Sequence, residues 1–318
     1  PLVQDPDWRV RVEAVKALAQ IRAYSFVTSM GLATEDQEPL VRLAAIEALG
    51  DLRASQGLSF IQTIMRENDD WRLRSAAIIA ESRIIGDGAL PELQKLRVST
   101  EWQIRRAVAQ AMGNLLSDQS RSVLGKMTAD TDSRVLAAVA QSLGNFPQIL
   151  AMDNLQELLR SDDLAVLTNA ASALGQRGDR LAVLPLCDAC DRLKSPSDTE
   201  PIVEILRALG LILAGGDGPS RGELTDEARK RAMETLGNAW KDPDRAVAIA
   251  AAAALKSIDG VDRAVASGAA SGTYPLFLDE IRAIKSPRVR IVTKLGNIII
   301  ELFPGAAPNT VANFLKLA

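Results

Sequence analysis

The hydrophobic positions of the chain recur at helical spacing within a phrase that returns every 31 or 32 residues. In the first copy, "DWRVRVEAVKALAQI", the apolar residues Val10, Ala14, Ala17 and Leu18 fall on one face of a helix. Units of this period cannot bury their apolar face alone and must stack. We therefore predict an all-α array. Its six clearest copies begin at Asp7, Glu38, Asp70, Glu101, Asp132 and Asp163.

Shorter apolar segments, such as "GLSFIQTIM" and "GALPELQKL", lie between the copies and predict a second helix in each unit. Two looser copies, "PIVEILRALGLIL" and "DRAVAIAAAAALKSI", extend the array further along the chain. A glycine follows the strongest periodicity in four copies, and we expect it to allow the backbone reversal that ends a helix. These glycines are Gly50, Gly113, Gly144 and Gly175.

An acidic residue opens each copy, and in four copies an arginine follows four residues later. This spacing predicts an ion pair within the helix, and it places negative charge at the positive end of the helix dipole. The pairs are Asp7 with Arg11, Glu38 with Arg42, Asp70 with Arg74 and Glu101 with Arg105. Leu136 and Leu167 replace the arginine in later copies. Glu81 stands where other copies have Leu, so we expect the third unit to be locally irregular.

The phrase "D-x-x-V-R-x-x-A-x-x-A-L-G", in two-helix units of about 31 residues, resembles HEAT repeats. It is most similar to the short bacterial form that is also found in phycobilisome-lyase-type proteins. The resemblance covers residues 1–257 and implies an α-α superhelix that holds protein partners. It also implies that the Asp and Arg positions link neighbouring repeats.

Composition narrows the function further. The chain of 318 residues has a formal charge of −3 with basic and acidic residues mixed along it, which argues against a nucleic-acid partner. It contains no histidine, so zinc sites with His ligands, Ser-His-Asp triads and Cys-His pairs are excluded from these residues. We expect no cofactor and no metal. The oligomeric state stays open.

No apolar run approaches the roughly 18 to 20 residues of a membrane helix, so we expect no membrane span. The chain starts at Pro1 without an initiator Met or a signal-peptide pattern, and we expect that the native N-terminus is missing. The protein is predicted to be soluble, and the sequence leaves cytoplasm and periplasm open as compartments.

Two stretches suggest chemistry that the context does not favour. Cys187 and Cys190 form a C-x-x-C, but the surrounding "LPLCDACDRL" is helical and no strand precedes it, so we interpret them as ordinary core or surface cysteines. The Gly-rich residues 214–223 follow a helical run and lack a phosphate-binding motif. We interpret them as a loop between helices.

Trp8, Trp71 and Trp102 occupy the same position in three copies, directly after the acidic residue. Their offset turns them away from the apolar stripe of the helix. One interpretation is that they cover the turns between adjacent units. The alternative is that they form a hydrophobic strip for a partner, because Trp is enriched at interface hot spots.

The pattern changes after residue 257. Residues 258–287 are rich in Gly, Ala and Ser and contain one short apolar segment, "LFLDEIRAI", so they predict a linker and a short helix. From residue 288 the apolar positions alternate, and Gly296-Asn297 is a two-residue hairpin signal between two antiparallel strands. Pro304 ends the second strand, and Asn309 can cap a final helix that contains Val311 and Phe314.

Residues 288–318 resemble the beginning of a cyclophilin-type peptidyl-prolyl cis-trans isomerase. The match consists of the first two barrel strands and the pattern "A-P-x-T-V-x-N-F", which is carried by Ala307, Pro308, Thr310, Val311, Asn313 and Phe314. The family's catalytic arginine and proline-pocket residues correspond to positions beyond Ala318. The resemblance therefore implies no catalytic residue in this chain, a truncated barrel, and X-Pro peptide binding by the complete protein.

Together these patterns predict the binding scaffold of a HEAT-repeat and cyclophilin fusion whose complete chain assists protein folding as an isomerase. Its partner is expected to be a protein or peptide client. One alternative is an interaction scaffold without catalysis. A second is a bilin-lyase-like protein, which would require an apolar groove of bilin size.

Overall fold

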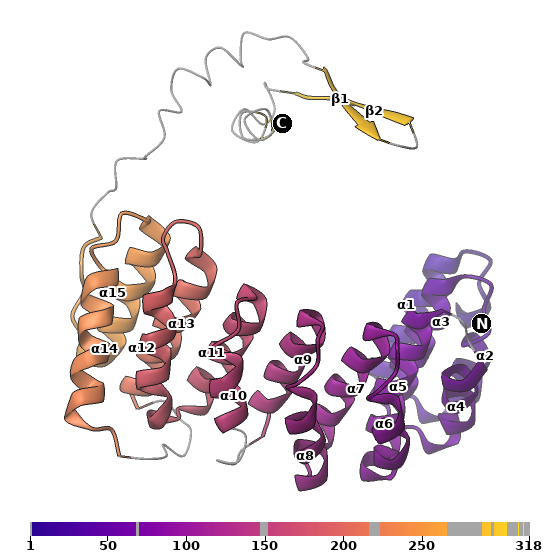
Figure 1. Cartoon of the computed structure of the whole chain (residues 1–318). Coiled ribbons are helices and arrows are strands. Elements are labelled where there is room, and N and C mark those ends of the chain that lie inside the picture. Colours follow the sequence, from indigo (N-terminus) through magenta and orange to yellow (C-terminus); the bar gives the residue numbers. More distant parts are fainter. Residues whose placement is uncertain are drawn as a thin grey trace. The chain divides into compact units, whose positions relative to one another are not determined.

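The computed structural model describes residues 2–67, 70–146, 152–215, 223–265, 288–293 and 296–303, together with Val311 and Phe314. The chain divides into a helical unit, Pro1–Ala266, and a shorter unit, Ser267–Ala318. Figure 1 shows the helical unit as a row of paired helices. Among the described residues, no helix combines the length and the apolar character needed to cross a bilayer.

Each copy of the repeated phrase forms one long helix, as the periodicity predicts. These helices lie side by side, and each packs against the next one in the row. They are α1 (Trp8–Gln20), α3 (Pro39–Asp51), α5 (Trp71–Ile85), α7 (Trp102–Leu115), α9 (Ser133–Gly144), α11 (Leu164–Arg177), α13 (Thr199–Leu213) and α15 (Arg245–Asp259).

The intervening apolar segments form the second helix of each pair. They make a second layer, which buries the apolar face of the first. They are α2 (Val27–Ala33), α4 (Leu58–Glu67), α6 (Leu90–Leu96), α8 (Asp118–Met127), α10 (Met152–Leu158), α12 (Val183–Arg192) and α14 (Asp226–Ala239). The predicted fold class, an all-α solenoid of the α-α superhelix type, is confirmed.

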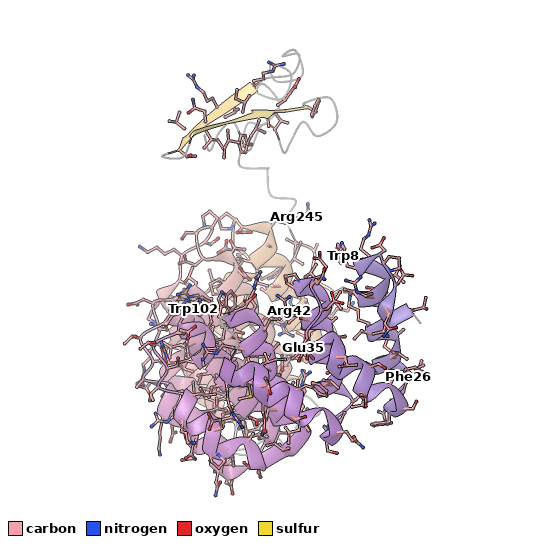
Figure 2. All side chains as sticks on the ribbon, turned by 90° about the vertical axis from the view of Figure 1, so that its right-hand side faces the viewer. Trp8, Phe26, Glu35, Arg42, Trp102 and Arg245 are labelled. Carbon is pink, nitrogen blue, oxygen red and sulfur yellow. The ribbon has the colours of Figure 1, made fainter. Side chains whose placement is uncertain are left out.

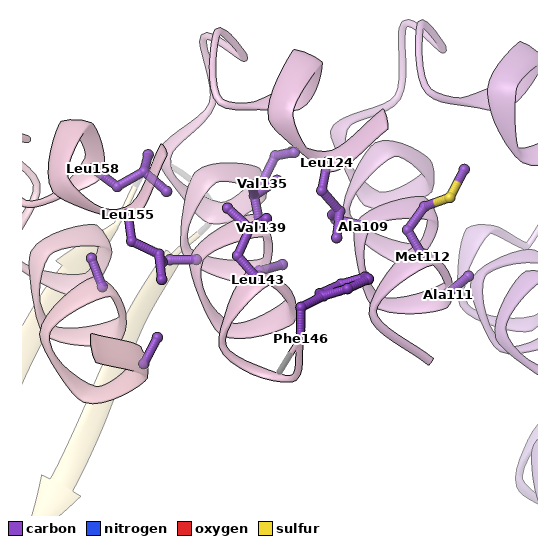
Figure 3. Close-up of a cluster of buried hydrophobic side chains, with 14 of the residues drawn as sticks. Ala109, Ala111, Met112, Leu124, Val135, Val139, Leu143, Phe146, Leu155 and Leu158 are labelled. Atoms are coloured by element: carbon purple, nitrogen blue, oxygen red, sulfur yellow. The ribbon is translucent and has the colours of Figure 1, made fainter. Parts of the chain in front are cut away.

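The core lies between the two layers and continues from repeat to repeat. Figure 3 shows part of it, where Leu124 of α8, Val139 and Leu143 of α9 and Leu155 of α10 are fully buried. Each of these side chains removes apolar surface that neither layer could bury alone, at about 25 cal/mol per Å². Burial between stacked pairs therefore holds the solenoid together.

An aspartate that opens the phrase caps the long helix. The Asp7 carboxylate accepts a hydrogen bond of 2.9 Å from the backbone N–H of Arg9, and Asp70, Asp132, Asp163 and Asp244 cap their helices in the same way. Such a cap contributes about 1 kcal/mol. Glu38 and Glu101 occupy the cap position without a capping bond from the side chain.

The expectation for the four glycines is wrong, because each belongs to its helix, Gly144 as the last residue of α9, and none has a positive φ. Each is a point where two long helices touch through small residues. An added Cβ at Gly144 would lie 2.9 Å from the Cβ of Ala173, and one at Gly175 would lie 2.6 Å from the Cα of Ala208. Gly50 meets Ala80 and Gly113 meets Ser142 in the same manner. Real Cβ atoms do not approach so closely, so only glycine permits this spacing.

The second unit contains the antiparallel hairpin that the alternation predicts. Strand β1 (Arg288–Thr293) pairs with β2 (Gly296–Glu301), with Arg288 opposite Glu301 and Thr293 opposite Gly296. The predicted position of the turn is wrong, because Gly296 and Asn297 belong to β2. Here the cross-strand register overrides the local Gly-Asn signal.

Several predicted features lie outside the described residues. These are the short helix in "LFLDEIRAI", most of the linker, the ends marked by Pro304 and Pro308, and the cap at Asn309. Val311 and Phe314 are helical, as expected, and Val311 is buried.

Candidate functional site

The three tryptophans are the first residues of α1, α5 and α7. Trp71 and Trp102 therefore lie on neighbouring helices, whereas α3 separates Trp8 from Trp71. Trp8 and Trp71 are 37% and 43% exposed, while Trp102 is half-buried against the core (Figure 2). The shared position thus produces two exposed side chains and one that is largely covered.

Trp102 is covered by the next repeat. The guanidinium of Arg134, on α9, stacks over the indole ring at 3.5 Å from the ring centroid. Arg134 is held there by Asp132, which accepts hydrogen bonds of 2.9 Å from Nε and 2.7 Å from Nη2. A cation–π contact contributes about 0.5 to 1 kcal/mol at an exposed site. Trp102 therefore fits the first interpretation, in which it covers the joint between units.

Trp8 and Trp71 belong to a wider group of exposed apolar side chains at the starts of α1, α3 and α5. Val10 is 36% exposed and Leu40, the second residue of α3, is 54% exposed. Because these helices lie side by side with their N-termini at one edge, the group forms a discontinuous apolar strip along that edge. We call Trp8, Val10, Leu40 and Trp71 the edge strip. Large apolar side chains at a solvent-facing edge are typical of protein-binding surfaces.

The prediction of ion pairs at four-residue spacing is wrong, because within the described residues Arg11, Arg42, Arg74 and Arg105 form no ion pair with the acid that opens their own phrase. Arg11 instead makes a two-pronged ion pair with Asp36 of the next repeat, with Nε–Oδ2 and Nη2–Oδ1 distances of 2.8 Å. Its Nη1 also donates to the backbone carbonyl of Asp5, at 2.8 Å. The capping bond already engages Asp7, so the arginine reaches the next loop. The arginine position therefore links repeats, as the family resemblance implies, whereas the aspartate of the phrase caps its own helix.

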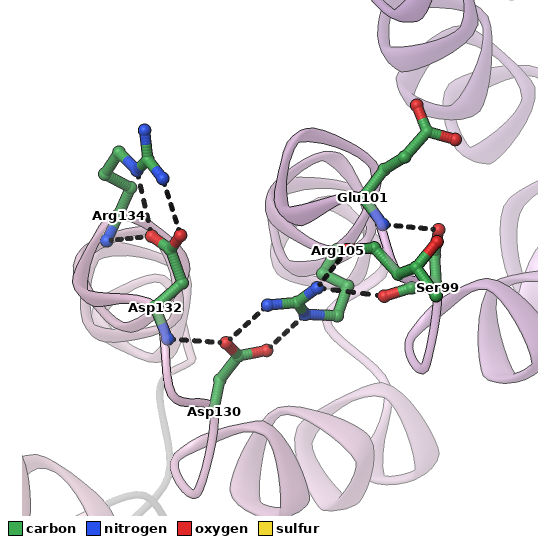
Figure 4. A network of polar contacts seen from close by, with 7 residues as sticks. Ser99, Glu101, Arg105, Asp130, Asp132 and Arg134 are labelled. Carbon is green, nitrogen blue, oxygen red and sulfur yellow. Dashed lines mark hydrogen bonds and ion pairs between the residues drawn. The ribbon is translucent and has the colours of Figure 1, made fainter.

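Arg105 repeats this geometry in the fourth repeat (Figure 4). Its guanidinium lies 2.7 Å and 2.9 Å from the two oxygens of Asp130, and Nη1 donates to the carbonyl of Ser99 at 2.9 Å. Arg74 reaches Glu101 of the next repeat at 2.8 Å. We call these three links, from Arg11, Arg74 and Arg105, the arginine ladder.

The ladder also sets the charge state of its acids. Hydrogen bonds from Arg11 hold the pKa of Asp36 below its usual range. Burial raises the pKa of Asp130, but the hydrogen bonds from Arg105 and from the backbone N–H of Asp132 outweigh burial and leave that pKa lowered as well. Both aspartates are therefore charged over the whole physiological range, and both pairs are retained there.

The sequence carried a signal for Asp36 and Asp130 that the periodicity did not reveal. Each lies two residues before the acid that opens the next phrase, in "DQE" and "DTD". The ladder ends where the arginine does, as expected. Leu136 and Leu167 stand in its place and pack into the core, and Leu167 is only 2% exposed.

A shallow hollow of about 350 Å³ crosses α7, α9 and α11. Its lining combines small side chains and amides with the charged side chains of Arg106, Arg134 and Asp163. The hollow therefore offers hydrogen-bond donors, acceptors and charges of both signs to a polar group of a partner.

The cysteines behave as ordinary core residues. Cys187 and Cys190 lie on α12, and Cys187 is fully buried. Burial raises the pKa of both thiols, that of Cys190 to about 12, so neither is a thiolate at neutral pH. Within the described ranges, no cluster of three or more metal-ligating side chains occurs. The loop expected at 214–223 lies between α13 and α14, and residues 216–222 fall outside the described chain.

The family model described as HEAT repeats matches residues 1–82 and 89–175, which is more than half of the chain. The chain belongs to the HEAT-repeat proteins. A second family model, described as cyclophilin type peptidyl-prolyl cis-trans isomerase/CLD, matches residues 288–318. A search of curated proteins finds no match.

Several solved structures resemble the HEAT-repeat chain distantly. An engineered protein is 23% identical, with 81% of this chain and 76% of that chain covered and a TM-score of 0.46. The CpcE–CpcF complex of phycocyanin lyase from Nostoc sp. PCC7120 is 21% identical, with 74% and 91% covered and a TM-score of 0.43. YibA of E. coli is 14% identical, with 81% and 89% covered and a TM-score of 0.47. At this level of sequence identity and TM-score, these structures indicate nothing about the function of this chain.

Proposed function

We propose that this chain is the binding scaffold of a HEAT-repeat and cyclophilin fusion, and that the complete protein is a peptidyl-prolyl cis-trans isomerase that assists folding. The proposal divides the chain into a solenoid at 1–257, a linker with a short helix at 258–287 and the start of the cyclophilin-type domain at 288–318. The observation that carries it is the cyclophilin-type match after the repeats, at 288–318.

The hairpin supports this assignment through the surface that it leaves open. Val292 is 74% exposed, Ile299 is 67% exposed and Ile298 is 54% exposed. Two isolated strands cannot bury enough apolar surface to be stable alone. Strands β1 and β2 thus have the composition of sheet strands that further chain would cover, as in a barrel.

The division of labour follows from this assignment. The solenoid would hold the client through the edge strip, Trp8, Val10, Leu40 and Trp71, and the complete isomerase domain would act on X-Pro bonds of the same client. In cyclophilin-type domains an arginine hydrogen-bonds the prolyl nitrogen and weakens amide conjugation, which lowers a barrier of about 18 to 20 kcal/mol. That arginine would lie beyond Ala318, so residues 1–318 would bind clients without catalysis.

The test of catalysis is an exchange measurement on an Ala-Pro peptide by NMR, with the complete chain beside residues 1–318. We expect accelerated cis-trans exchange with the complete chain only. Exchange catalysed by residues 1–318 would contradict the assignment of catalysis to the missing part. No acceleration by either chain would favour a scaffold without catalysis.

Client binding is tested separately, with reduced and carboxymethylated lactalbumin as an unfolded, proline-containing probe. We expect Trp8→Ala combined with Trp71→Ala to weaken binding by about tenfold or more, because exposed Trp side chains dominate interface energetics. Trp102→Ala is the matched control, because its ring is already covered by Arg134. Equal losses from both variants would show that the edge strip is not the binding surface.

A further inference from the structure

The third repeat carries a carboxylate in its core. Glu81 on α5 is only 4% exposed, although it stands at a position that is apolar in every other long helix. The equivalent residues are Leu18, Leu49, Met112, Leu143, Leu174, Leu209 and Leu255. A charged residue at a core position lowers stability unless its groups are paired. The substitution therefore needs a reason outside the packing of the solenoid.

The partners of Glu81 satisfy only half of its carboxylate. Gln62 of α4 donates from Nε2 to Oε1 at 3.0 Å. The other oxygen, Oε2, is buried and has no hydrogen-bond partner among the residues that the structure describes. Buried polar atoms in native proteins are nearly always paired, and leaving one unpaired is costly. An unpaired oxygen on a carboxylate is an open acceptor for a cationic donor.

Glu81 lies against a hollow rather than a closed core. A pocket of about 200 Å³ opens between α4, α5 and α6, and both Glu81 and Gln62 line it. Met65, Ile85 and Leu96 form apolar walls, and Glu92 and Arg66 are the other charged lining residues. Pockets for cofactors and drug-sized ligands are typically about 300 to 1,000 Å³. This pocket has the size for the end of one side chain.

We propose that this pocket binds the guanidinium group of an arginine side chain from a protein partner. The carboxylate of Glu81 would accept from the guanidinium through Oε2. Glu92, at the rim, is already paired with Lys95 at 3.0 Å, so Glu81 would supply the main negative charge. The apolar walls suit the methylene stem and the weakly hydrated, planar guanidinium better than a strongly hydrated ammonium. This inference does not depend on isomerase activity, since it concerns only the third repeat.

The first experiment compares thermal unfolding of the chain with that of Glu81→Leu, which restores the side chain found in most other repeats. Thermal unfolding of the variant should occur about 2 to 4 °C higher, because a well-packed apolar side chain replaces a half-satisfied carboxylate. A lower midpoint would show that Glu81 supports the fold, and would overturn the proposal.

The second experiment measures ligand binding directly, with Nα-acetyl-arginine amide as the probe and its uncharged citrulline counterpart as the ligand control. NMR of the Gln62 side-chain amide reports on the pocket. We expect saturable shifts with the arginine probe alone, about tenfold weaker affinity in Glu81→Gln, and no binding in Glu81→Leu. Glu47→Gln, which removes an exposed carboxylate from α3, should bind as the unaltered chain does. Equal shifts with citrulline, or unchanged binding in Glu81→Gln, would overturn the proposal.

Arg66 is the cation of this chain that could fill the pocket itself. No ion pair of Arg66 occurs within the described part of the chain, so it leaves Glu81 open. Arg66→Gln should therefore unfold within about 1 °C of the unaltered chain. A clear loss of stability, together with a gain in probe affinity, would identify Arg66 as the occupant and overturn the assignment to a partner.

Discussion

The early repeats of the solenoid have a first-turn arginine link that the later repeats lack, whereas both have arginines near helix C-termini that reach back to the preceding repeat. In the early repeats the arginine lies in the first turn, as Arg11 and Arg105 do, and reaches forward to an aspartate of the next repeat. Arg83, in the last turn of α5, reaches back to Asp51 at 2.6 Å. In the later repeats the arginine is the last residue of the long helix or of its partner helix. Arg177, at the end of α11, donates to the carbonyl of Phe146 in the preceding repeat at 2.8 Å. Arg192, on α12, bonds the carbonyls of Arg160 and Leu159.

This difference shows which features of the contact between neighbouring repeats are shared by all repeats and which vary. Both groups of repeats keep small residues where the long helices touch, and both keep a guanidinium on loop carbonyls. What differs is the first-turn arginine, which Leu136 and Leu167 replace in the later repeats. We infer that close helix contact is the fixed requirement of the stack. The arginines satisfy carbonyls that any loop between repeats would otherwise leave unpaired.

The largest expected effect lies in the later repeats. Arg177 pairs with Asp179 at 2.9 Å, and the two side chains are only 7% and 4% exposed. Arg177→Met should lower the free energy of unfolding by about 3 kcal/mol, because it removes the cationic partner of the buried Asp179 carboxyl group. Urea unfolding measures the loss, and hydrogen exchange locates it. Arg105→Met in the early repeats is the matched comparison and should cost less, about 2 kcal/mol, because its pair is 14% and 9% exposed. The reverse order would contradict this reading.

Close helix contact predicts a loss of about 2 kcal/mol for Gly175→Ala. The added methyl group would meet the backbone of Ala208 at 2.6 Å, and backbone cannot move aside as a flexible side chain can. The control is Gly237→Ala on α14, where nothing lies within 4 Å of the added atom. That variant should be unchanged or stabilised by about 0.5 to 1 kcal/mol, because alanine favours the helix. Denaturant unfolding of the two variants compares them directly, and equal effects would refute the role assigned to Gly175.

We expect that an arginine–aspartate link of the arginine ladder can be replaced by uncharged residues with little loss of stability. Arg105→Leu with Asp130→Ser copies the residues that the next joint has at the same positions, Leu136 and Ser161, and Ser161 still accepts from the N–H of Asp163 at 3.1 Å. The double variant should therefore remain within about 1 kcal/mol of the unaltered chain. Arg105→Leu alone should lose about 2 kcal/mol, because Asp130 is left unpaired. A double variant as unstable as the single one would show that the two kinds of joint are not equivalent.

Much of the solenoid was predictable from the sequence, because stacking imposes the same burial on every unit. The long helices, the capping aspartates and the end of the ladder at Leu136 all follow from one repeated pattern. The acceptors Asp36 and Asp130 did not, because they lie in loops, where no periodicity marks a side chain. The glycines were misinterpreted for a related reason. A glycine that ends a helix and one that admits a neighbouring helix look alike until the neighbour is placed.

The candidate sites were less predictable than the fold. The three tryptophans share one position, yet only Trp102 is covered. The repeat that follows Trp102 carries Arg134, whereas the repeat that follows Trp8 carries Leu40 at the same position. That outcome depends on the relative placement of two helices, which a single phrase does not encode. The sequence indicated that Glu81 is irregular. It did not indicate the unpaired oxygen or the adjoining pocket, because both depend on how α4 and α6 pack against α5.

The smallest expected effect is a difference in acid sensitivity between the ladder and its replacement. The pKa values of Asp36 and Asp130 are lowered in the folded chain, so between the folded and unfolded pKa values the native state binds fewer protons. The stability from each pair is therefore present above the unfolded pKa, about 3.9, and is lost as the pH falls through the folded value. At neutral pH the free energy of unfolding of the unaltered chain should exceed that of the Arg105→Leu, Asp130→Ser double variant by up to about 1 kcal/mol. That gap should close as the pH falls below about 4, because protonation removes an interaction that the variant already lacks. Urea unfolding at a series of pH values measures the gap, and a gap that stays constant into acid would mean that the Asp130 carboxylate contributes no charge-dependent stability to its joint.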